Sequence, residues 1–445
     1  MQRIKFRAEI LATDDPRMEA ALQLAYASKE RPLCECTQPG VAMYIAHVAD
    51  SYVLKRMPNS GSRHHPECES FDPPAELSGL GEVSGSAIQE DTESGITTLK
   101  LDFTLAKLGK RVEPAAAGAE PDSVRTDGKK LTLRGMLHYL WDEAELNKWV
   151  PAMAGKRSWF VVRNRLLEAA ANKLAKGDAL DSMLFIPESF VLDRKDEILG
   201  RRLEKLRRLS EPAKGPRKLM LMVAEVKHIE PSRYGHKFVL KHLPDMPLML
   251  AEDLHKRIFK RFENDLALWD SDEATHLVMI GTFGFDGAGN ACAEEVSLVV
   301  TTANWIPVEN RSDLQLVDTL THDGRRFSKG LRYNMAAERP LATAVLLDTT
   351  PRAVALYVVP ANVKPEFKAA LDQLVESSEL ASWTWLAGET AMPGLPALHG
   401  YLAASSPPAP EVEVLEPLDA LRRATQDAAA NNPVTGSDVD AGAPF

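Results

Sequence analysis

Short runs of alternating apolar and polar residues dominate the first seventy positions of the chain. The opening segment MQRIKFRAEI places Ile4 and Phe6 on one face, which is typical of a strand. The runs VAMYIAHV and SYVLKRM also favour strands, and the residues ADS between them favour a turn. We therefore interpret residues 1–70 as short strands, two of which pair as a hairpin.

Helical spacing replaces this alternation between residues 131 and 210. LTLRGMLHYLWDEAELNKW has Thr132 in the N-cap position, followed by apolar residues three to four positions apart. SWFVVRNRLLEAAANKLAKG predicts a second helix that Gly177 ends. RKDEILGRRLEKLRRLSEPAKGPRK predicts a third helix, amphipathic and very basic, which Pro212 and Gly215 break.

Strands predominate again from residue 217. KLMLMVAEVKHIEPSRYGHKFVLKHL predicts a hairpin around Pro231–Gly235, and AEDLHKRIFKRFENDLALW predicts a helix. THLVMIGTFGF and EEVSLVVTTANW predict further strands. After about residue 403 the chain is rich in Pro and Ala, which favours a disordered tail with one short helix near 417–430.

These patterns predict an α+β multidomain protein, and a length of 445 residues suits about two to four domains. The predicted parts are, in order, a β module (1–72), a connector with short strands and a flexible loop (73–130), a basic helical region (131–215), an α/β domain (216–403) and a disordered tail (404–445).

Composition narrows the class of protein. Hydrophobic residues make up 44% of the chain and charged residues 26%, which is ordinary for a globular protein. No apolar run approaches the ~18 residues of a membrane helix, and the start of the chain has no apolar signal segment. We therefore expect a cytoplasmic protein with no membrane partner, and four cysteines are too few for a disulfide scaffold.

Cysteines and histidines gather at both ends of the predicted N-terminal hairpin. LCEC supplies Cys34 and Cys36, and SGSRHHPEC supplies His64, His65 and Cys68. Because a hairpin brings its open ends together, three thiolates and one imidazole would meet there, a ligand set that suits a structural zinc ion. The spacing does not decide between His64 and His65. The alternative is that these are reduced cysteines and surface histidines in loops.

Positive charge is concentrated in the helical region. The chain has a net charge of −10, yet residues 148–218 contain 17 Lys and Arg against 9 Asp and Glu. Such a block favours a phosphate-bearing or other acidic partner. The candidate nucleic-acid-binding residues are Arg157, Arg163, Arg165, Arg201, Arg202, Arg207 and Arg208. The alternative is a solvated helix face that pairs with acidic residues of the same chain.

The order of elements predicted for residues 311–386 is αβββαβ, which resembles the core of the PD-(D/E)XK nucleases. That resemblance implies an acid at the end of the second strand, where Asp348 stands, and an acid and a lysine on the third. The third strand reads AVALYVV and carries neither, so the core would be degenerate. Asp313 lies on the first helix, and Lys329, Arg332 and Tyr333 are candidate phosphate ligands.

One E-x-K pair does occur elsewhere, at Glu225 and Lys227 in MVAEVKHI. The spacing of two residues predicts that both side chains share one face of a strand. No acidic partner is well placed before them in the sequence. An exposed or cross-strand charge pair is therefore the alternative to a catalytic role.

The layout of several motifs resembles a bacterial family, domain of unknown function 1173. These motifs are Cys-x-Cys, YVLKRMPNSG followed by HHPEC, RGMLHYLWDEAELNKW, AEVKHI and RRFSKGLRYN. The resemblance runs over roughly residues 1–400. It implies three N-terminal cysteines, which fit Cys34, Cys36 and Cys68, and a frequent location of the genes in integrative and conjugative elements. By association, that context implies work linked to DNA.

Together, the sequence predicts a non-catalytic nucleic-acid-binding accessory protein of a mobile element, with a structural zinc site. A metal-dependent nuclease of the PD-(D/E)XK kind that uses Glu225 and Lys227, or Asp348, is one alternative. A protein-interaction scaffold whose basic face docks an acidic partner is another.

Overall fold

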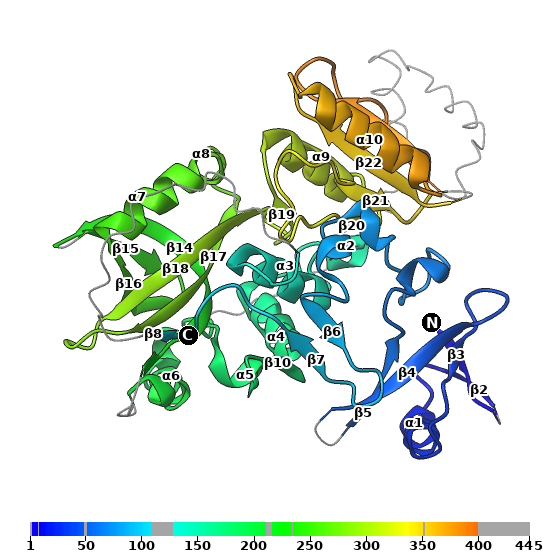
Figure 1. Ribbon diagram of the computed structural model, residues 1–445, viewed down its shortest axis with the longest axis horizontal. Coiled ribbons are helices and arrows are strands. Elements are labelled where there is room, and N and C mark those ends of the chain that lie inside the picture. The colour runs from blue at the N-terminus through cyan, green and yellow to red at the C-terminus, as the bar shows by residue number, and fades with distance from the viewer. Residues whose placement is uncertain are drawn as a thin grey trace, which may run out of the picture. The chain divides into compact units, whose positions relative to one another are not determined.

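A computed structural model describes most of the chain up to residue 398 (Figure 1). The described residues are 2–7, 9–48, 51–107, 128–210, 216–233, 235–349 and 352–398. Three predictions lie outside them: most of the flexible loop in the connector, the helix break at Pro212 and Gly215, and the disordered tail with its short helix.

The N-terminal module is built on an antiparallel sheet. Its strands follow the order β2-β1-β3-β4-β5. They are β1 (Arg3–Lys5), β2 (Ile10–Ala12), β3 (Leu33–Cys34), β4 (Val41–Val48) and β5 (Ser51–Arg56). The predicted hairpin is confirmed, because β4 pairs with β5 from Met43–Arg56 to Val48–Ser51. Ile4 and Phe6 are both buried, as the alternation predicted.

The interpretation of residues 1–70 as strands alone was wrong in one place. The segment MEAALQLAYA forms the helix α1 (Met18–Ala27). Its buried residues Met18, Leu22 and Ala25 recur at helical spacing and pack in the small core of the sheet. Alanine and leucine favour helix more than strand, and this propensity outweighs the short apolar runs on either side.

A second small sheet joins the connector to the helical region. It has the order β11-β10-β7-β6, formed by β6 (Ile88–Glu90), β7 (Thr97–Leu99), β10 (Lys173–Ala175) and β11 (Asp178–Ala179). The second predicted helix therefore ends early: α4 (Trp159–Ala170) stops before Gly177, because Lys173–Ala175 pair with β7. Before this sheet lie the short 3₁₀ turn η2 (Ala75–Leu77) and the helix α2 (Leu80–Val83).

Helix α3 (Leu133–Glu143) lies in the interior of the molecule. Thr132 caps it as predicted, accepting a hydrogen bond from the backbone N–H of Gly135 at 3.0 Å. Nearly every side of the helix is buried, so residues such as Met136 and Leu140 share one core with α4 and with strands from other parts of the chain. The helix is therefore a packing centre rather than part of a separate helical layer.

Five strands, labelled in Figure 1, pair in a ring and so form a closed barrel. They are β14 (Met220–Ser232), β15 (Gly235–Leu240), β16 (Leu243–Ala251), β17 (His276–Phe285) and β18 (Ala291–Thr301). The order is β14-β15-β16-β18-β17, and β17 pairs back with β14. Neighbours are antiparallel except for β16 and β18, which run parallel. The hairpin predicted around Pro231–Gly235 is confirmed by β14 and β15.

This connectivity is that of the oligonucleotide/oligosaccharide-binding (OB) fold, a five-stranded Greek-key barrel. In that fold a helix links the third strand to the fourth, and the third and fifth strands run parallel. Here α7 (Glu252–Arg261) and α8 (Glu263–Asp270) occupy the position of that helix, divided at Phe262 where one helix was predicted. A β-bulge between Val226 and His228 lets β14 pair with β17 in its first half and with β15 in its second.

The C-terminal part contains the predicted order of elements αβββαβ. These are α9 (Arg311–His322), β20 (Phe327–Lys329), β21 (Ala344–Leu346), β22 (Val354–Val359), α10 (Pro365–Ser377) and β23 (Ala381–Leu386). The first three strands are antiparallel and β23 runs parallel to β22. A fifth strand, β9 (Lys148–Trp149), pairs with β20 from far upstream. The likeness to a nuclease core stays a prediction, as do the domain boundaries.

The remaining elements connect these parts. The basic helix α6 (Lys195–Ser210) follows the short α5 (Leu180–Met183) and β12 (Leu184–Phe185), and β12 extends the barrel sheet beside β14. The short strands β8 (Ala106–Lys107) and β13 (Arg217–Lys218) pair with each other, and β19 (Pro307–Val308) pairs with β18. None of the helices built from the described residues has the length and apolar character needed to cross a bilayer.

Gly79 lies where the connector crosses the backbone of residues 331–332. Its N–H donates to the carbonyl oxygen of Leu331 at 2.8 Å, and a Cβ there would lie less than 3.0 Å from the carbonyl oxygen of Arg332. We therefore expect Gly79→Ala to lower the free energy of unfolding by about 1–3 kcal/mol, measured by chemical denaturation. The control is Gly287→Ala, where a Cβ meets no atom within 4 Å. Equal stabilities for the two variants would contradict the close approach.

Candidate metal centre and neighbouring charged sites

Four candidate ligands converge in the N-terminal module. Cys34 is the last residue of β3, and Cys36 lies in the turn that follows. His64 comes directly after the 3₁₀ turn η1 (Gly61–Arg63), and Cys68 lies further along the same loop. The β4–β5 hairpin connects the first pair of ligands to the second. The prediction that a hairpin brings the two pairs together therefore holds.

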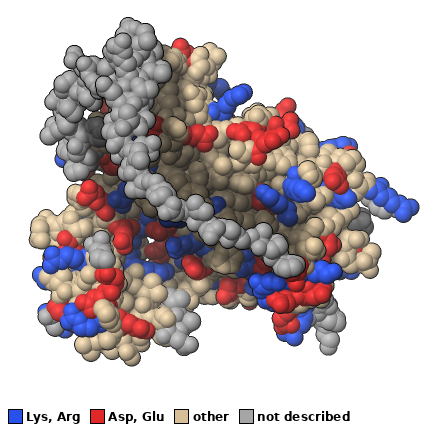
Figure 2. Space-filling model, turned by 180° about the vertical axis from the view of Figure 1, so that it is seen from behind, with Lys and Arg blue, Asp and Glu red and all other residues tan. Residues whose placement is uncertain are grey.

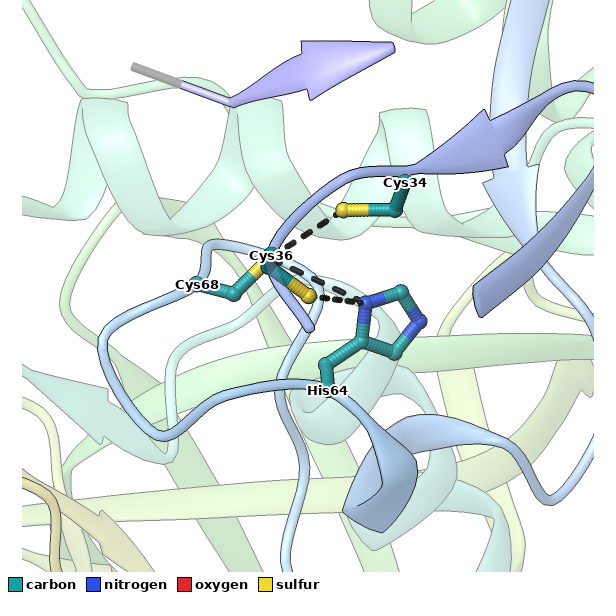
Figure 3. A group of neighbouring side chains, drawn as sticks. All are labelled: Cys34, Cys36, His64 and Cys68. Carbon is teal, nitrogen blue, oxygen red and sulfur yellow. Dashed lines mark hydrogen bonds between the residues drawn. The ribbon is translucent and has the colours of Figure 1, made fainter. Parts of the chain in front are cut away.

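The ligand atoms have the spacing of a tetrahedral site. The Sγ atoms of Cys34 and Cys68 are 3.7 Å apart, and Nδ1 of His64 lies 3.3 Å from Sγ of Cys36 and 3.8 Å from Sγ of Cys68. Zn–S bonds of about 2.3 Å and Zn–N bonds of about 2.0 Å in a tetrahedron imply ligand–ligand distances of about 3.5–3.8 Å. Figure 3 shows the imidazole of His64 directed at the sulfur atoms. The four side chains therefore lie close enough to hold a metal ion.

Hydrogen bonds orient the sulfur atoms from outside the cluster. Nε2 of Gln2 donates to Sγ of Cys34 at 3.1 Å and to Oγ of Ser70 at 2.8 Å, and the backbone N–H of His65 donates to Sγ of Cys36 at 3.5 Å. A hydrogen bond from Cys68 lowers the pKa of Cys34, whereas burial raises the pKa of Cys36. The charge of a bound cation would favour the thiolate form of the cysteines that hold it.

The structure separates the two histidines that the sequence left open. His64 is 3% exposed and lies in the cluster. His65 is exposed, and its Nδ1 accepts a hydrogen bond from the backbone N–H of Glu67 at 3.3 Å. The group that can share one ion is Cys34, Cys36, His64 and Cys68, with His65 outside it. Four protein ligands fill a tetrahedron, so such a site is structural rather than catalytic.

The chain is similar to one known protein family over most of its length. The model of a family described as a protein of unknown function, DUF1173, matches residues 5–388. The chain belongs to the DUF1173 family. The predicted resemblance is thereby confirmed, while the association with mobile elements stays a prediction. No curated protein and no solved structure matches the chain.

The arginines predicted to contact nucleic acid have partners within this DUF1173 chain. Arg157 is turned inward, where its guanidinium donates to the backbone carbonyl oxygens of Leu146 and Asn304. The other six pair with acidic side chains: Arg163 and Arg201 with Glu188, Arg165 with Glu168, Arg202 with Asp245, Arg207 with Glu204, and Arg208 with Asp178. On the face seen in Figure 2, Lys and Arg side chains likewise lie among Asp and Glu.

The two acids of the nuclease-like segment form ion pairs with buried basic side chains. The carboxylate of Asp313 lies 3.2 Å from Nζ of Lys329, and both side chains are nearly fully buried. Asp348 accepts hydrogen bonds from the guanidinium of Arg325, at 2.8 Å for the shortest. These acids therefore neutralise separate cations, and β22 supplies no further acid to bring them to one metal ion.

The candidate phosphate ligands of this segment are also engaged in the interior. Besides the Lys329 ion pair, Arg332 donates to the carboxylate of Glu309 at 2.9 Å. The hydroxyl of Tyr333 donates to Asp142 at 2.6 Å. These contacts join α3, α9 and the loop after β20 in one buried polar network. These internal contacts account for the polar residues of SKGLRYN, so a phosphate ligand is not needed to explain them.

The prediction that Glu225 and Lys227 share one face of a strand was wrong. Because the β-bulge falls at Lys227, Glu225 is buried while Lys227 is exposed. The carboxylate of Glu225 instead contacts Nδ1 of His276 at 2.7 Å, Nζ of Lys241 at 2.8 Å and Nε2 of His242 at 3.3 Å. Sequence reasoning missed this group, since its members stand on three different strands and turns and share no local spacing.

The rings of this group are packed against tryptophans. The imidazole of His276 stacks on Trp305 with ring centroids 3.9 Å apart, and that of His242 stacks on Trp159 at 5.2 Å. Hydrogen bonds from His276 and Lys241, with His242 3.3 Å away, offset the burial of Glu225 and lower its pKa to about 2. Glu225 is therefore an ionised side chain that ties the β15–β16 turn to the start of β17.

A third group combines His236, Glu252 and His255, whose ligand atoms lie within 4.8 Å of one another. His236 is on β15, and Glu252 and His255 share one face of α7. The two imidazole rings are parallel within 3°, with centroids 3.4 Å apart. A metal ion lies in the plane of each imidazole that binds it, and one ion cannot lie in two parallel planes. The arrangement is that of an aromatic stack.

The ionised Glu225 predicts a specific loss of stability in acid. The carboxyl group has an ordinary pKa of 4.5 and a pKa of about 2 in the folded chain. Its contribution is therefore present above about pH 4.5 and is lost as the pH falls through that range towards 2. We expect Glu225→Gln to unfold more easily at pH 7 and to lose less stability than the parent between pH 5 and pH 3.

Urea unfolding at several pH values measures this difference. Substitution of the exposed Glu273 by glutamine is the matched control and should leave the pH dependence unchanged. An identical acid profile for the parent and Glu225→Gln would contradict the role of this carboxylate.

Proposed function

We propose that this protein is a non-catalytic nucleic-acid-binding accessory protein whose N-terminal module is held together by one structural zinc ion. The observation that carries the nucleic-acid part is the connectivity of the β14–β18 barrel, because barrels of this type commonly bind oligonucleotides. Fold alone does not fix function, so the argument also needs a surface of suitable chemistry.

Zinc is the metal that the chemistry of the cluster favours. Thiolates are soft ligands and imidazole is borderline, a set that suits zinc better than magnesium or calcium, which take oxygen ligands. The module also needs a fixed centre, because its core consists of a few short strands and one helix. A small core of this kind gains stability from a bound metal. The ion would hold β3 to the loop that contains His64 and Cys68.

Helix α7 supplies a basic surface beside the barrel. It packs on β15, β16 and β18, and Lys256, Arg257 and Lys260 lie on its exposed side. This surface differs from the basic block that the sequence indicated. Lys256 of α7 is also paired, with Glu252 of the same helix at 3.4 Å, so both surfaces contain cations that have partners in the chain. What favours α7 is its packing against β15, β16 and β18 of the barrel. We therefore assign the nucleic-acid contact to α7 and the neighbouring barrel strands.

Metal content tests the zinc part of the proposal. Purified protein should contain one zinc ion per chain by mass spectrometry, and His64→Ala should lose it while His65→Ala keeps it. The pair is closely matched, because the two residues are adjacent and only His64 lies in the cluster. Cys292→Ser, far from the cluster in sequence, should also retain the ion. Zinc retained in His64→Ala, or absent from the parent, would contradict the assignment.

Fluorescence anisotropy with short single- and double-stranded DNA in a salt series tests the nucleic-acid part. We expect log affinity to fall with log salt with a slope of about −3 or steeper, since several phosphate contacts release counterions. Reversing Lys256, Arg257 and Lys260 to glutamate should weaken binding by more than about tenfold and flatten the slope.

The matched control changes the charge by the same amount elsewhere. Reversal of Arg165, Arg194 and Arg207, which are exposed on α4, η4 (Leu192–Arg194) and α6, should have a much smaller effect. If this control weakens binding and the α7 variant does not, the contact lies on the basic block instead. No binding at low salt would overturn the proposed function in favour of a protein partner, and magnesium-dependent cleavage of the DNA would favour the nuclease alternative.

A further inference from the structure

Three aromatic side chains form a continuous row at one end of the barrel. His236 on β15 stacks on His255 of α7 with centroids 3.4 Å apart, and His255 lies 4.3 Å from Phe259 one turn further along the helix. Phe259 ends the row and is 40% exposed. A large aromatic side chain that is exposed at the end of such a row has a free ring face. A flat group of a ligand can stack on that face.

Ring contacts, rather than hydrogen bonds, hold the row in place: the two imidazoles are stacked, and the ring of Phe259 is tilted by 46° to that of His255. Neither ring nitrogen of His255 has a hydrogen-bond partner among the described residues, and Nδ1 of His236 has only a 3.9 Å contact with the carboxylate of Glu252. Burial and the neighbouring His236 lower the pKa of His255, which favours its neutral form. The rings can therefore exchange one stacking partner for another without loss of a hydrogen bond.

The row lies next to the turn between the first two barrel strands. His236 is the second residue after the β14–β15 turn, and α7 begins directly after β16, so the row lies beside the first barrel turn. In OB-type barrels the loop between the first two strands takes part in binding oligonucleotides. Lys256 and Lys260 flank Phe259 in the sequence of α7 and are exposed with it. His255 and Phe259 thus lie one helical turn apart beside these two lysines, of which Lys256 also pairs with Glu252 at 3.4 Å.

We propose that Phe259 and His255 form a stacking platform for the unpaired bases of a single-stranded nucleic acid. This proposal rests on the nucleic-acid-binding function proposed above and adds the form of the ligand and the residues that select it. In a duplex the bases are already stacked on one another, so an exposed ring attracts a single strand in preference. The lysines contact phosphates of either form, whereas the aromatic row distinguishes them.

The test measures the full-length protein with an oligonucleotide of about 12 deoxythymidines and with a duplex of the same length. Phe259→Ala should weaken binding of the single strand by about 5- to 100-fold, the usual effect of removing one stacking partner. Binding of the duplex and the salt slope for both ligands should stay unchanged, because no charge is altered. Phe259→Trp should restore or strengthen single-strand binding.

The matched control is Phe160→Ala, which removes another exposed phenylalanine, on α4. It should leave single-strand affinity unchanged, and thermal unfolding of both alanine variants should match that of the parent. If the parent binds the single strand and Phe259→Ala binds equally well, the platform is wrong while the proposed function stands. If the parent binds neither ligand, the proposed function fails first. An equal loss for single strand and duplex would also overturn the platform, because it would indicate a general change of the surface.

Discussion

The burial of helix α3 is the constraint on which the other parts of the structure depend. A helix enclosed on nearly all sides leaves little water for its polar side chains, so Asp142 and Glu143 near its C-terminal end depend on partners from other segments. Asp142 receives hydrogen bonds from Tyr333 at 2.6 Å and from Asn147 at 2.7 Å. Glu143 pairs with Lys173 of β10 at 2.7 Å. One end of the helix is thereby tied to β10, to the loop after β20 and to the residue before β9.

The same helix explains the unusual backbone at Tyr333. This residue has a φ of +49°, which is unfavourable for a side chain with a Cβ. Its backbone N–H donates to Nδ1 of His138 at 2.9 Å while its hydroxyl reaches Asp142 one turn further along α3. Burial lowers the pKa of His138 to about 3, which keeps the imidazole neutral and able to accept that hydrogen bond. Two contacts to one rigid helix offset the strain of one residue.

The sequence predicted those features that depend on local spacing. The β4–β5 hairpin follows from alternation over adjacent residues, and it brings Cys34 and Cys36 to His64 and Cys68. Features that depend on contacts between residues far apart in the sequence could not be predicted from local spacing. The strands of the barrel were mostly expected, but the pairing of β14 with β17, which makes the barrel, has no local signal. The partners of Glu225 were missed for the same reason, because His242 and His276 approach it only when the barrel closes.

The strand β9 has a consequence for how the chain reaches its native state. The barrel strands are continuous in sequence, so they can pair as soon as residues up to Thr301 are available. The sheet of β20–β23 is different, because its edge is completed by Lys148 and Trp149, which pair with Ser328 and Phe327. A long stretch of chain, including the whole barrel, separates these partners. Closing such a loop costs entropy, so we expect this edge to form late in folding and β20 to be open to pairing with other chains until then.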